Sequence, residues 1–442
     1  MRGRARRVRP AAAAAPARPA EPRGRRPLRA LAAVAAGLVL ALGSATVAQA
    51  DQVRDLEYWL TEYGFAQAWH TTQGAGVKVA IIDTGVDGSV PDLAGAVVDG
   101  TDVSGVGAAN GQKPLGDANS ADHGTWVASL LAGRGTGPTS GVLGAAPQAQ
   151  LLTVSIALGT AAGSVGTDEQ IAAAVRWSVD HGAKVINMSL TRNTLDWPTS
   201  WDDAFQYAFA HDVVVVAAAG NRGSGTTEVG APATIPGVLT VAGVDRQGKA
   251  SFDASSQGIT IGVAAPSEEL VGASPGGGYV QWAGTSGAAP LVSGAVALVR
   301  AAHPELSAAD VIERLIATAR PVPGAVPSPI YGYGLLDAAA AVTARVPHVT
   351  ANPMGDLTQW IHVHRRAEST AVPVPGGASV ATDTPRALPP ERDLRLDQLL
   401  WPQWGALTTF WLPFSLIAGF IALAALGGVG AWRHFRRTAS RE

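Results

Sequence analysis

The chain has 442 residues, a formal net charge of −2, and 47 % hydrophobic against 15 % charged residues. This length is enough to bury a large core and exceeds that of one average domain. A net charge near zero provides no overall positive field, so nucleic acid is excluded as an expected partner. Cysteine is absent, which excludes disulfides, zinc sites built from thiolates and a cysteine nucleophile.

Residues 1–50 have the pattern of an export signal. An Arg-rich region precedes a short apolar run at 28–42, and Ala48-Gln49-Ala50 follows. A basic region, a short apolar run and an Ala-x-Ala site are typical of a secretory signal peptide, and the run is shorter than the roughly 20 residues that span a bilayer. We predict cleavage after Ala50, with an uncleaved signal anchor as the alternative. Both Sec and Tat export remain open.

Residues 51–76 form a short segment before the first strand-like run, which begins at Val77. An inhibitory pro-domain of the ordinary kind is a small folded domain and needs a longer chain than this. From Leu56 to Trp69 apolar and polar residues are interspersed in the manner of an amphipathic helix. We therefore expect an N-terminal arm that lies on the domain that follows.

Residues 77–341 alternate apolar runs with segments of helical periodicity. Strands are predicted at 77–82, 150–156, 184–188, 213–217, 238–241 and 259–263, and helices at 168–180, 201–211, 286–302 and 307–318. Near-continuous apolar strands separated by helices indicate an α/β fold, with a mostly parallel sheet covered by helices on both faces. Functional residues of such sheets gather at the carboxyl ends of the strands, and Asp83 directly follows the first strand.

The C-terminal part of the chain is predicted to contain a linker and a membrane anchor. Residues 342–404 are rich in proline and lack periodicity, which favours an extended linker. Residues 405–432 are apolar without a charge, long enough for one transmembrane helix, and 433–442 form a basic tail. By the positive-inside rule the tail is cytoplasmic and the domain at 77–341 is extracellular. A buried core helix is the alternative for 405–432.

Four polar residues each stand in a glycine-containing motif and together supply an acid, a base, an amide and a hydroxyl. They are Asp83 in Asp-Thr-Gly, His123 in His-Gly-Thr, Asn221 after Ala-Ala-Ala-Gly, and Ser286 in Gly-Thr-Ser-Gly. Taken singly, each is explained as a cap or turn residue. Together they suit attack on a peptide carbonyl, because a serine hydroxyl needs a base to take its proton and histidine titrates near neutral pH.

The chain order Asp83, His123, Ser286 resembles that of the subtilases, which are subtilisin-like serine endopeptidases. Three further segments resemble this family: 185–190 its substrate-binding strand, 251–266 the segment before the nucleophile, and 332–338 its C-terminal signature. The resemblance implies a subtilisin-like three-layer fold and hydrolysis of polypeptides through an acyl-enzyme on Ser286. His123 would be the base, Asp83 its orienting carboxylate and Asn221 an oxyanion donor. No cofactor is implied.

The resemblance also implies a set of substrate-binding residues: Ser189, Leu190, Thr191, Gly220 and Arg222. Thr191 stands where many subtilases have glycine, and would narrow the S1 pocket. Arg222 is expected near the pocket floor, where it would favour an acidic P1 residue; a surface arginine is the alternative. Gly287 stands where subtilases usually carry Met, which implies free room or flexibility behind Ser286.

Aspartates are frequent in the region before His123: Asp87, Asp92, Asp99, Asp102, Asp117 and Asp122. Subtilases often bind Ca²⁺ through loop oxygens, but no ligand spacing is readable here. We interpret these residues as solvated loop charge and assign no metal.

A short arm, a subtilase domain, a Pro-rich linker and one C-terminal helix resemble the mycosins, membrane-anchored subtilases associated with type VII secretion. This resemblance implies a protease that processes substrates of a secretion complex at the membrane. The alternative is a structural subunit that stabilises such a complex, with proteolysis secondary. The absence of cysteine departs from the mycosin pattern, in which loops commonly carry disulfides.

Overall fold

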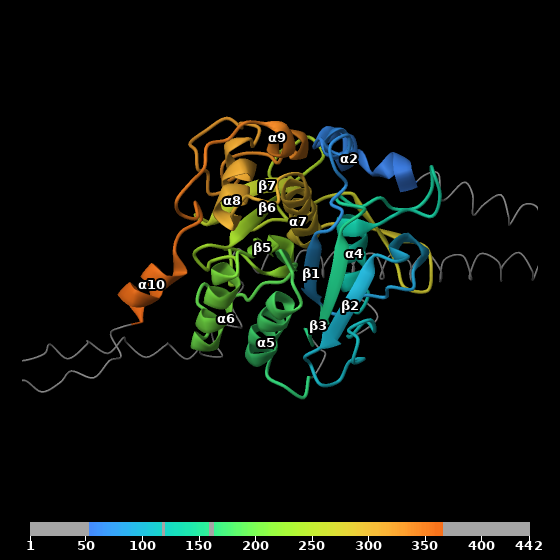
Figure 1. Cartoon of the computed structure of the whole chain (residues 1–442), viewed down its shortest axis with the longest axis horizontal. Coiled ribbons are helices and arrows are strands. Elements are labelled where there is room, and N and C mark those ends of the chain that lie inside the picture. Colours follow the sequence, from blue (N-terminus) through green and yellow to red (C-terminus); the bar gives the residue numbers. More distant parts are fainter. Residues whose placement is uncertain (1–52, 117–119, 159–162, 366–442) are drawn as a thin grey trace, which may run out of the picture. The chain divides into compact units, whose positions relative to one another are not determined.

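The computed structural model describes residues 53–116, 120–158 and 163–365 (Figure 1). Its centre is a seven-stranded sheet in the order β2-β3-β1-β4-β5-β6-β7, with every neighbouring pair parallel. The strands are β1 Lys78–Asp83, β2 Val97–Asp102, β3 Gln150–Ser155, β4 Val185–Met188, β5 Val214–Ala218, β6 Leu239–Val244 and β7 Ile261–Pro266. The predicted α/β class with a parallel sheet is confirmed.

Helices cover both faces of the sheet, so that the apolar strands β1 and β3 to β7 are buried along almost their whole length. One group pairs α4 His123–Ala132 with α7 Thr285–Ala302, and α8 Ala308–Ala317 packs on α7. The other pairs α5 Thr167–Asp180 with α6 Thr199–Ala210. Single 3₁₀ turns lie at Pro91–Leu93 and Arg222–Ser224.

The predicted strands and helices are present within a few residues of their expected ends. The edge strand β2 was not predicted, because its sequence Val-Val-Asp-Gly-Thr-Asp is polar and its side chains are half-buried or exposed. The two-stranded antiparallel sheet of β8 Leu270–Ala273 and β9 Tyr279–Trp282 was also missed. It packs against α4 and precedes α7, so it borders the region where both of these helices begin.

The strand order places a crevice where the functional candidates lie. After β1 the chain moves to β2 and β3 on one side, and then crosses to β4 and the remaining strands on the other. In open α/β sheets, ligands bind outside the carboxyl ends of the strands at such a reversal. Asp83 is the last residue of β1, Ser189 directly follows β4, and Asn221 follows β5, so all three lie at this edge.

The N-terminal arm lies on the domain, as its amphipathic pattern predicts. It contains α2 Tyr58–Glu62 and α3 Phe65–Ala68, and Trp59 and Phe65 are fully buried. Glu57, just before α2, accepts a hydrogen bond from the Leu143 N–H at 2.7 Å. Burial raises the pKa of Glu57 to about 8, against the opposing effects of Arg54 and of the Leu143 hydrogen bond.

The predicted linker begins too early, because its first part folds onto the domain. Residues 342–365 include the end of α9 Ala338–Thr343 and the whole of α10 Leu357–His364. Arg314 of α8 donates to the carbonyls of Ala341 (2.8 Å), Val342 (3.1 Å) and Ala344 (2.6 Å). Hydrogen bonds to the buried Arg314 guanidinium hold this segment on the domain, although it lacks the periodicity from which folded elements are predicted.

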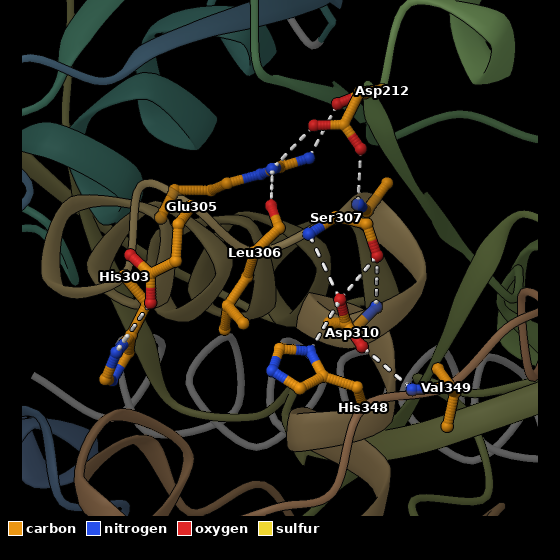
Figure 2. Close-up of polar contacts among 10 residues, drawn as sticks. Asp212, His303, Glu305, Leu306, Ser307, Asp310, His348 and Val349 are labelled. Atoms are coloured by element: carbon orange, nitrogen blue, oxygen red, sulfur yellow. Dashed lines mark hydrogen bonds and ion pairs between the residues drawn. The ribbon is translucent and has the colours of Figure 1, made fainter.

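Asp310 at the start of α8 makes a second attachment of this segment (Figure 2). Its carboxylate accepts from the Val349 N–H at 2.9 Å and lies 3.3 Å from His348 Nδ1. It also completes a capping box with Ser307. Desolvation would raise the pKa of Asp310, but the hydrogen bonds from Ser307, Val349 and His348 lower it to about 2. The domain therefore extends at least to residue 365.

The predicted signal at 1–50, the rest of the linker, the transmembrane segment at 405–432 and the tail at 433–442 lie outside the described residues. Within the described ranges, α7 is the one helix long and apolar enough to cross a membrane. Of its residues, 83 % are buried inside the protein, as expected of the central helix of a folded domain.

Candidate active site

Three elements that meet at the crevice carry the predicted acid, base and nucleophile. Asp83 ends β1, His123 is the first residue of α4, and Ser286 is the second residue of α7. Residues at a strand end or a helix start have backbone groups without partners inside their own element. Such positions bring together side chains that are far apart in the sequence and leave nearby N–H groups for a ligand.

Asp83 and His123 are in direct contact, although they are 40 residues apart in the chain. His123 Nδ1 lies 2.8 Å from Asp83 Oδ1, and the Thr84 N–H donates to the same oxygen at 2.7 Å. Thr84 Oγ1 donates to the Ala121 carbonyl at 2.9 Å and accepts from the Gly124 N–H at 3.1 Å. Thr84 thus fastens the start of α4 to the end of β1. Its motif was noted in the sequence, but this positioning role was not.

Burial makes the Asp83 carboxylate a strong influence on the imidazole. Asp83 is fully buried, and its Oδ2 has no hydrogen-bond partner among the described residues. Desolvation alone would lower the pKa of His123, but the charge and hydrogen bond of Asp83 outweigh it and raise the pKa above 6.5. A carboxylate with one oxygen unsatisfied interacts best with a protonated ring, so this pair stabilises an imidazolium.

The raised pKa of His123 predicts the acidic side of the pH–activity profile. A general base must be neutral, so kcat/KM should increase with pH through a midpoint above 6.5. The measurement is kcat/KM for one peptide between about pH 5 and about pH 9. In Asp83→Asn the charge that raises the pKa is gone, so the midpoint should move down while the rate falls steeply. An identical midpoint in both proteins would contradict this assignment.

Ser286 is held against the segment that follows β4. Its Oγ donates to the Ser189 carbonyl at 3.1 Å, and Ser189 Oγ donates to the Ser286 carbonyl at 2.8 Å. The fully buried Asn187 connects this pair to α7, since its Nδ2 donates to Ser189 Oγ at 3.0 Å and its Oδ1 accepts from Ser293 Oγ at 2.9 Å. Asn187 was not singled out from sequence, although an amide inside an apolar strand is a readable signal.

Asn221 is oriented by the residue before Ser286. Its Oδ1 accepts from the Thr285 N–H at 2.8 Å and from Thr285 Oγ1 at 2.9 Å. Gly220, with a φ of +100°, turns the chain so that its own N–H donates to Thr285 Oγ1 at 3.1 Å. Because the amide oxygen is engaged, the amide N–H groups are left to donate elsewhere. Thr285 is a second positioning residue that sequence reasoning missed.

The predicted substrate-binding residues lie on both sides of Ser286. Ser189, Leu190 and Thr191 continue from β4, and Thr191 Oγ1 donates to the Arg192 carbonyl at 2.8 Å. Gly220 lies on the other side, beside Thr285. Arg222 donates from Nε to the Ser255 carbonyl at 3.0 Å and stacks on the exposed Phe252 ring at 4.6 Å. The structure thus gives Arg222 surface partners of its own.

The free room expected behind Ser286 is filled. A Cβ added at Gly287 would lie 2.2 Å from Leu270 Cδ1 and 3.3 Å from both Leu130 Cδ1 and Trp282 Cη2. Leu270 and Trp282 are opposite each other in the β8–β9 pair. The hairpin therefore supplies the bulk that the helix residue lacks, and the expectation of free room was wrong.

We predict that Gly287→Met overpacks this contact and lowers the free energy of unfolding by about 1–3 kcal/mol. Leu270 is fully buried, so it has little space into which to move. The measurement is urea unfolding of the wild type, Gly287→Met, Leu270→Ala and the double variant Gly287→Met/Leu270→Ala. Leu270→Ala removes the side chain that the new Met would meet, so the double variant should be more stable than Leu270→Ala alone. Equal stability of wild type and Gly287→Met would refute the packing argument.

The described aspartates before His123 accept hydrogen bonds in separate parts of the domain and do not converge. Asp92 accepts from the Val142 N–H at 2.6 Å, and Asp102 accepts from Ser104 Oγ at 2.6 Å and Ser155 Oγ at 2.7 Å. Asp122 precedes α4 as its N-cap residue, and Asp117 lies outside the described residues. Across the described ranges no group of three or more His, Cys, Asp or Glu side chains is placed to hold a metal ion.

Comparison with known proteins identifies the class that this fold and site represent. The profile of the subtilase family matches residues 74–334. Subtilisin DY of Bacillus licheniformis is 38 % identical over 272 residues, which are 61 % of this chain and 92 % of that protein. Fervidolysin of Fervidobacterium pennivorans is 35 % identical over 309 residues, 64 % of this chain but only 42 % of that protein.

A solved structure of MycP1 from the ESX-1 type VII secretion system has a TM-score of 0.57 at 31 % identity, and covers 67 % of this chain and 88 % of that one. The chain belongs to the subtilase family, and it is a subtilisin-like serine endopeptidase.

Proposed function

We propose that Asp83, His123 and Ser286 are the catalytic triad and that Asn221 is an oxyanion donor. The observation that carries this is the 2.8 Å contact between His123 Nδ1 and the buried Asp83 Oδ1, at the crevice where Thr285 links Asn221 to Ser286. A carboxylate bound at Nδ1 holds the ring in the tautomer whose Nε2 can accept a proton.

The reaction follows from these positions. Ser286 Oγ attacks the carbonyl carbon of the scissile bond while its proton passes to His123 Nε2. The tetrahedral oxygen accepts hydrogen bonds from the Asn221 amide and from the Ser286 N–H at the start of α7. His123 then protonates the leaving amine as the C–N bond breaks. Water attacks the acyl-enzyme by the same route and releases the second product.

One movement is required before attack. Ser286 Oγ donates to the Ser189 carbonyl, so the hydroxyl must turn toward His123 Nε2 when substrate binds. Catalytic hydrogen bonds are often formed only in the complex with substrate. Trp126 and Trp282 pack edge-on against His123, with ring centroids 6.4 Å and 5.7 Å away, and limit the movement of its ring.

We also propose that the enzyme is anchored in the cell membrane by residues 405–432, with the catalytic domain extracellular and the C-terminus cytoplasmic. The charge-free apolar stretch and the basic residues after it support this. Its proposed task is to process substrates of a type VII-like secretion complex. The likeness to MycP1 over 88 % of that chain supports this assignment.

A structural role in such a complex is the second candidate. A related structure is described as that of an essential component of the type VII (ESX-1) secretion system, and an essential component can act by binding as well as by cleavage. The intact set of acid, base, amide and hydroxyl favours the enzymatic role.

The membrane anchor is tested by cell fractionation in the native host. We expect the full chain to sediment with membranes and a chain ending at residue 404 to be released outside the cell. A full chain found in the soluble fraction would refute the anchor.

The enzymatic and structural roles are separated by complementation of a deletion strain. Ser286→Ala should restore complex assembly but not substrate processing if both roles exist. Full processing by Ser286→Ala would refute the enzymatic proposal.

A further inference from the structure

Two chain segments flank Ser286 and define where substrate must enter. Ser189 exchanges two hydrogen bonds with Ser286 on one side. On the other side Gly220 and Asn221 are bound to Thr285. In the bound substrate, the oxygen of the scissile carbonyl points to the Asn221 amide and its carbon lies at Ser286 Oγ. The residue that carries this carbonyl is P1, and its side chain must therefore lie between these two chain segments.

Beyond these residues, the segments 191–194 and 226–231 are held together by hydrogen bonds. Arg192 N–H donates to the Ala231 carbonyl at 2.7 Å, and Ala231 N–H donates to the Thr194 carbonyl at 2.9 Å. Thr226 Oγ1 donates to Asn193 Oδ1 at 2.7 Å. These bonds join the two segments into one continuous wall.

Thr191 and Gly230 are in contact at the inner side of this wall. A Cβ added at Gly230 would lie 2.6 Å from Thr191 Oγ1 and 1.8 Å from the Arg192 carbonyl oxygen. The Thr191 hydroxyl cannot turn away freely, because it donates to the Arg192 carbonyl at 2.8 Å. A β-branched side chain is also stiff about its first torsion. The side chain of Thr191 therefore takes space that a long P1 residue would need.

Both nearby arginines have partners outside this space. The Arg222 guanidinium is bound to the Ser255 carbonyl and stacked on Phe252. Arg192 pairs with Asp168 and lies over the Trp201 ring at 5.4 Å. Ser189, Gly220 and Thr191 are uncharged, so an acidic or basic P1 side chain would lose its hydration without compensation.

We propose that Thr191 closes the S1 pocket, which receives the P1 side chain, and restricts the enzyme to peptides with a small uncharged P1 residue, namely Gly, Ala or Ser. This inference rests on the proposed function, since it needs Ser286 as the nucleophile. It replaces the acidic preference that Arg222 suggested from sequence. Thr191 acts as a specificity-determining residue and takes no part in proton transfer.

The test uses the purified full chain and four peptides that differ only at P1, with Ala, Phe, Asp or Lys. For the wild type we expect kcat/KM for Ala to exceed that for each of the others by about tenfold or more. Thr191→Gly should raise the Phe/Ala ratio by about tenfold or more. Thr191→Val, which keeps the volume but not the hydroxyl, should keep the preference for Ala, and Thr191→Ser should give an intermediate ratio.

Labelling with a serine-directed fluorophosphonate separates the ways in which the proposal can fail. If the wild type is labelled at Ser286 but cleaves the Phe peptide as well as the Ala peptide, the inference is overturned and the proposed function stands. A preference for the Asp peptide would overturn the inference in favour of an acidic P1 preference set by Arg222. If Thr191→Gly and Thr191→Ser are both labelled but their Phe/Ala ratio is unchanged, the role of Thr191 is overturned as well. A wild type that is never labelled overturns the proposed function and this inference with it.

Discussion

Ser286→Ala should lower kcat by about 10⁶-fold and abolish labelling by a fluorophosphonate probe. In subtilisin, a member of the same family, loss of the nucleophilic serine has an effect of about this size. The reason is that no other group can form the acyl intermediate. Oxyanion donors and substrate binding alone leave a residual acceleration of about 10³–10⁴ over water.

The substitution removes one hydroxyl and leaves its surroundings intact, so the fold should persist. Ser286 donates only to the Ser189 carbonyl among the hydrogen bonds described here, and net loss of one such bond costs about 1 kcal/mol. Ser200→Ala is the matched control, since Ser200 is an exposed residue of α6. The control should keep full kcat and labelling. Retention of measurable labelling in Ser286→Ala would show that another residue is the nucleophile.

Asn221→Ala should lower kcat by about 10²–10³-fold, equivalent to about 2.7–4 kcal/mol of transition-state stabilisation. This range comes from the corresponding asparagine of subtilisin, so it is carried over from the family. The physical reason is present in this chain: the Asn221 oxygen is fixed by Thr285 at 2.8 Å and 2.9 Å, which aims the amide N–H groups without reorganisation during the reaction.

The effect should fall on kcat and leave KM nearly unchanged, because the oxyanion exists only beyond the ground state. Asn221→Asp provides a sharper test, since a carboxylate of the same size accepts hydrogen bonds but cannot donate them when ionised. It should be at least as impaired as Asn221→Ala. Asn352→Ala, which removes a donor to the remote Gly237 carbonyl, serves as the control. A larger change in KM than in kcat would argue that Asn221 binds substrate instead.

Local sequence patterns were sufficient for the buried strands and long helices. The apolar runs that became β1, β3 and β4 are buried on both faces, and a run with that composition has few other stable positions. Edge elements were less readable. The polar β2 resembles a loop, and residues 342–365 resemble a linker because they lack periodicity. Their attachment depends on Arg314 and Asp310, which lie earlier in the chain.

The candidate site was predictable as a set of residues but not as a geometry. The motifs around Asp83, His123, Asn221 and Ser286 indicated the chemistry only when taken together. The orienting roles of Thr84, Asn187 and Thr285 were not foreseen, since each acts through hydrogen bonds to segments distant in sequence. The same holds for the space beside Gly287, which Leu270 fills from a distant strand.

Local sequence alone was enough to predict the α/β class and the family and to suggest the reactive groups. Short-range properties suffice for these, because periodicity and motif residues are local. The tertiary structure decided which residues are held in place and how much room a substrate has. The contact between Thr191 and Gly230 and that between Asp83 and His123 depend on where separate strands end, and chain topology sets those positions.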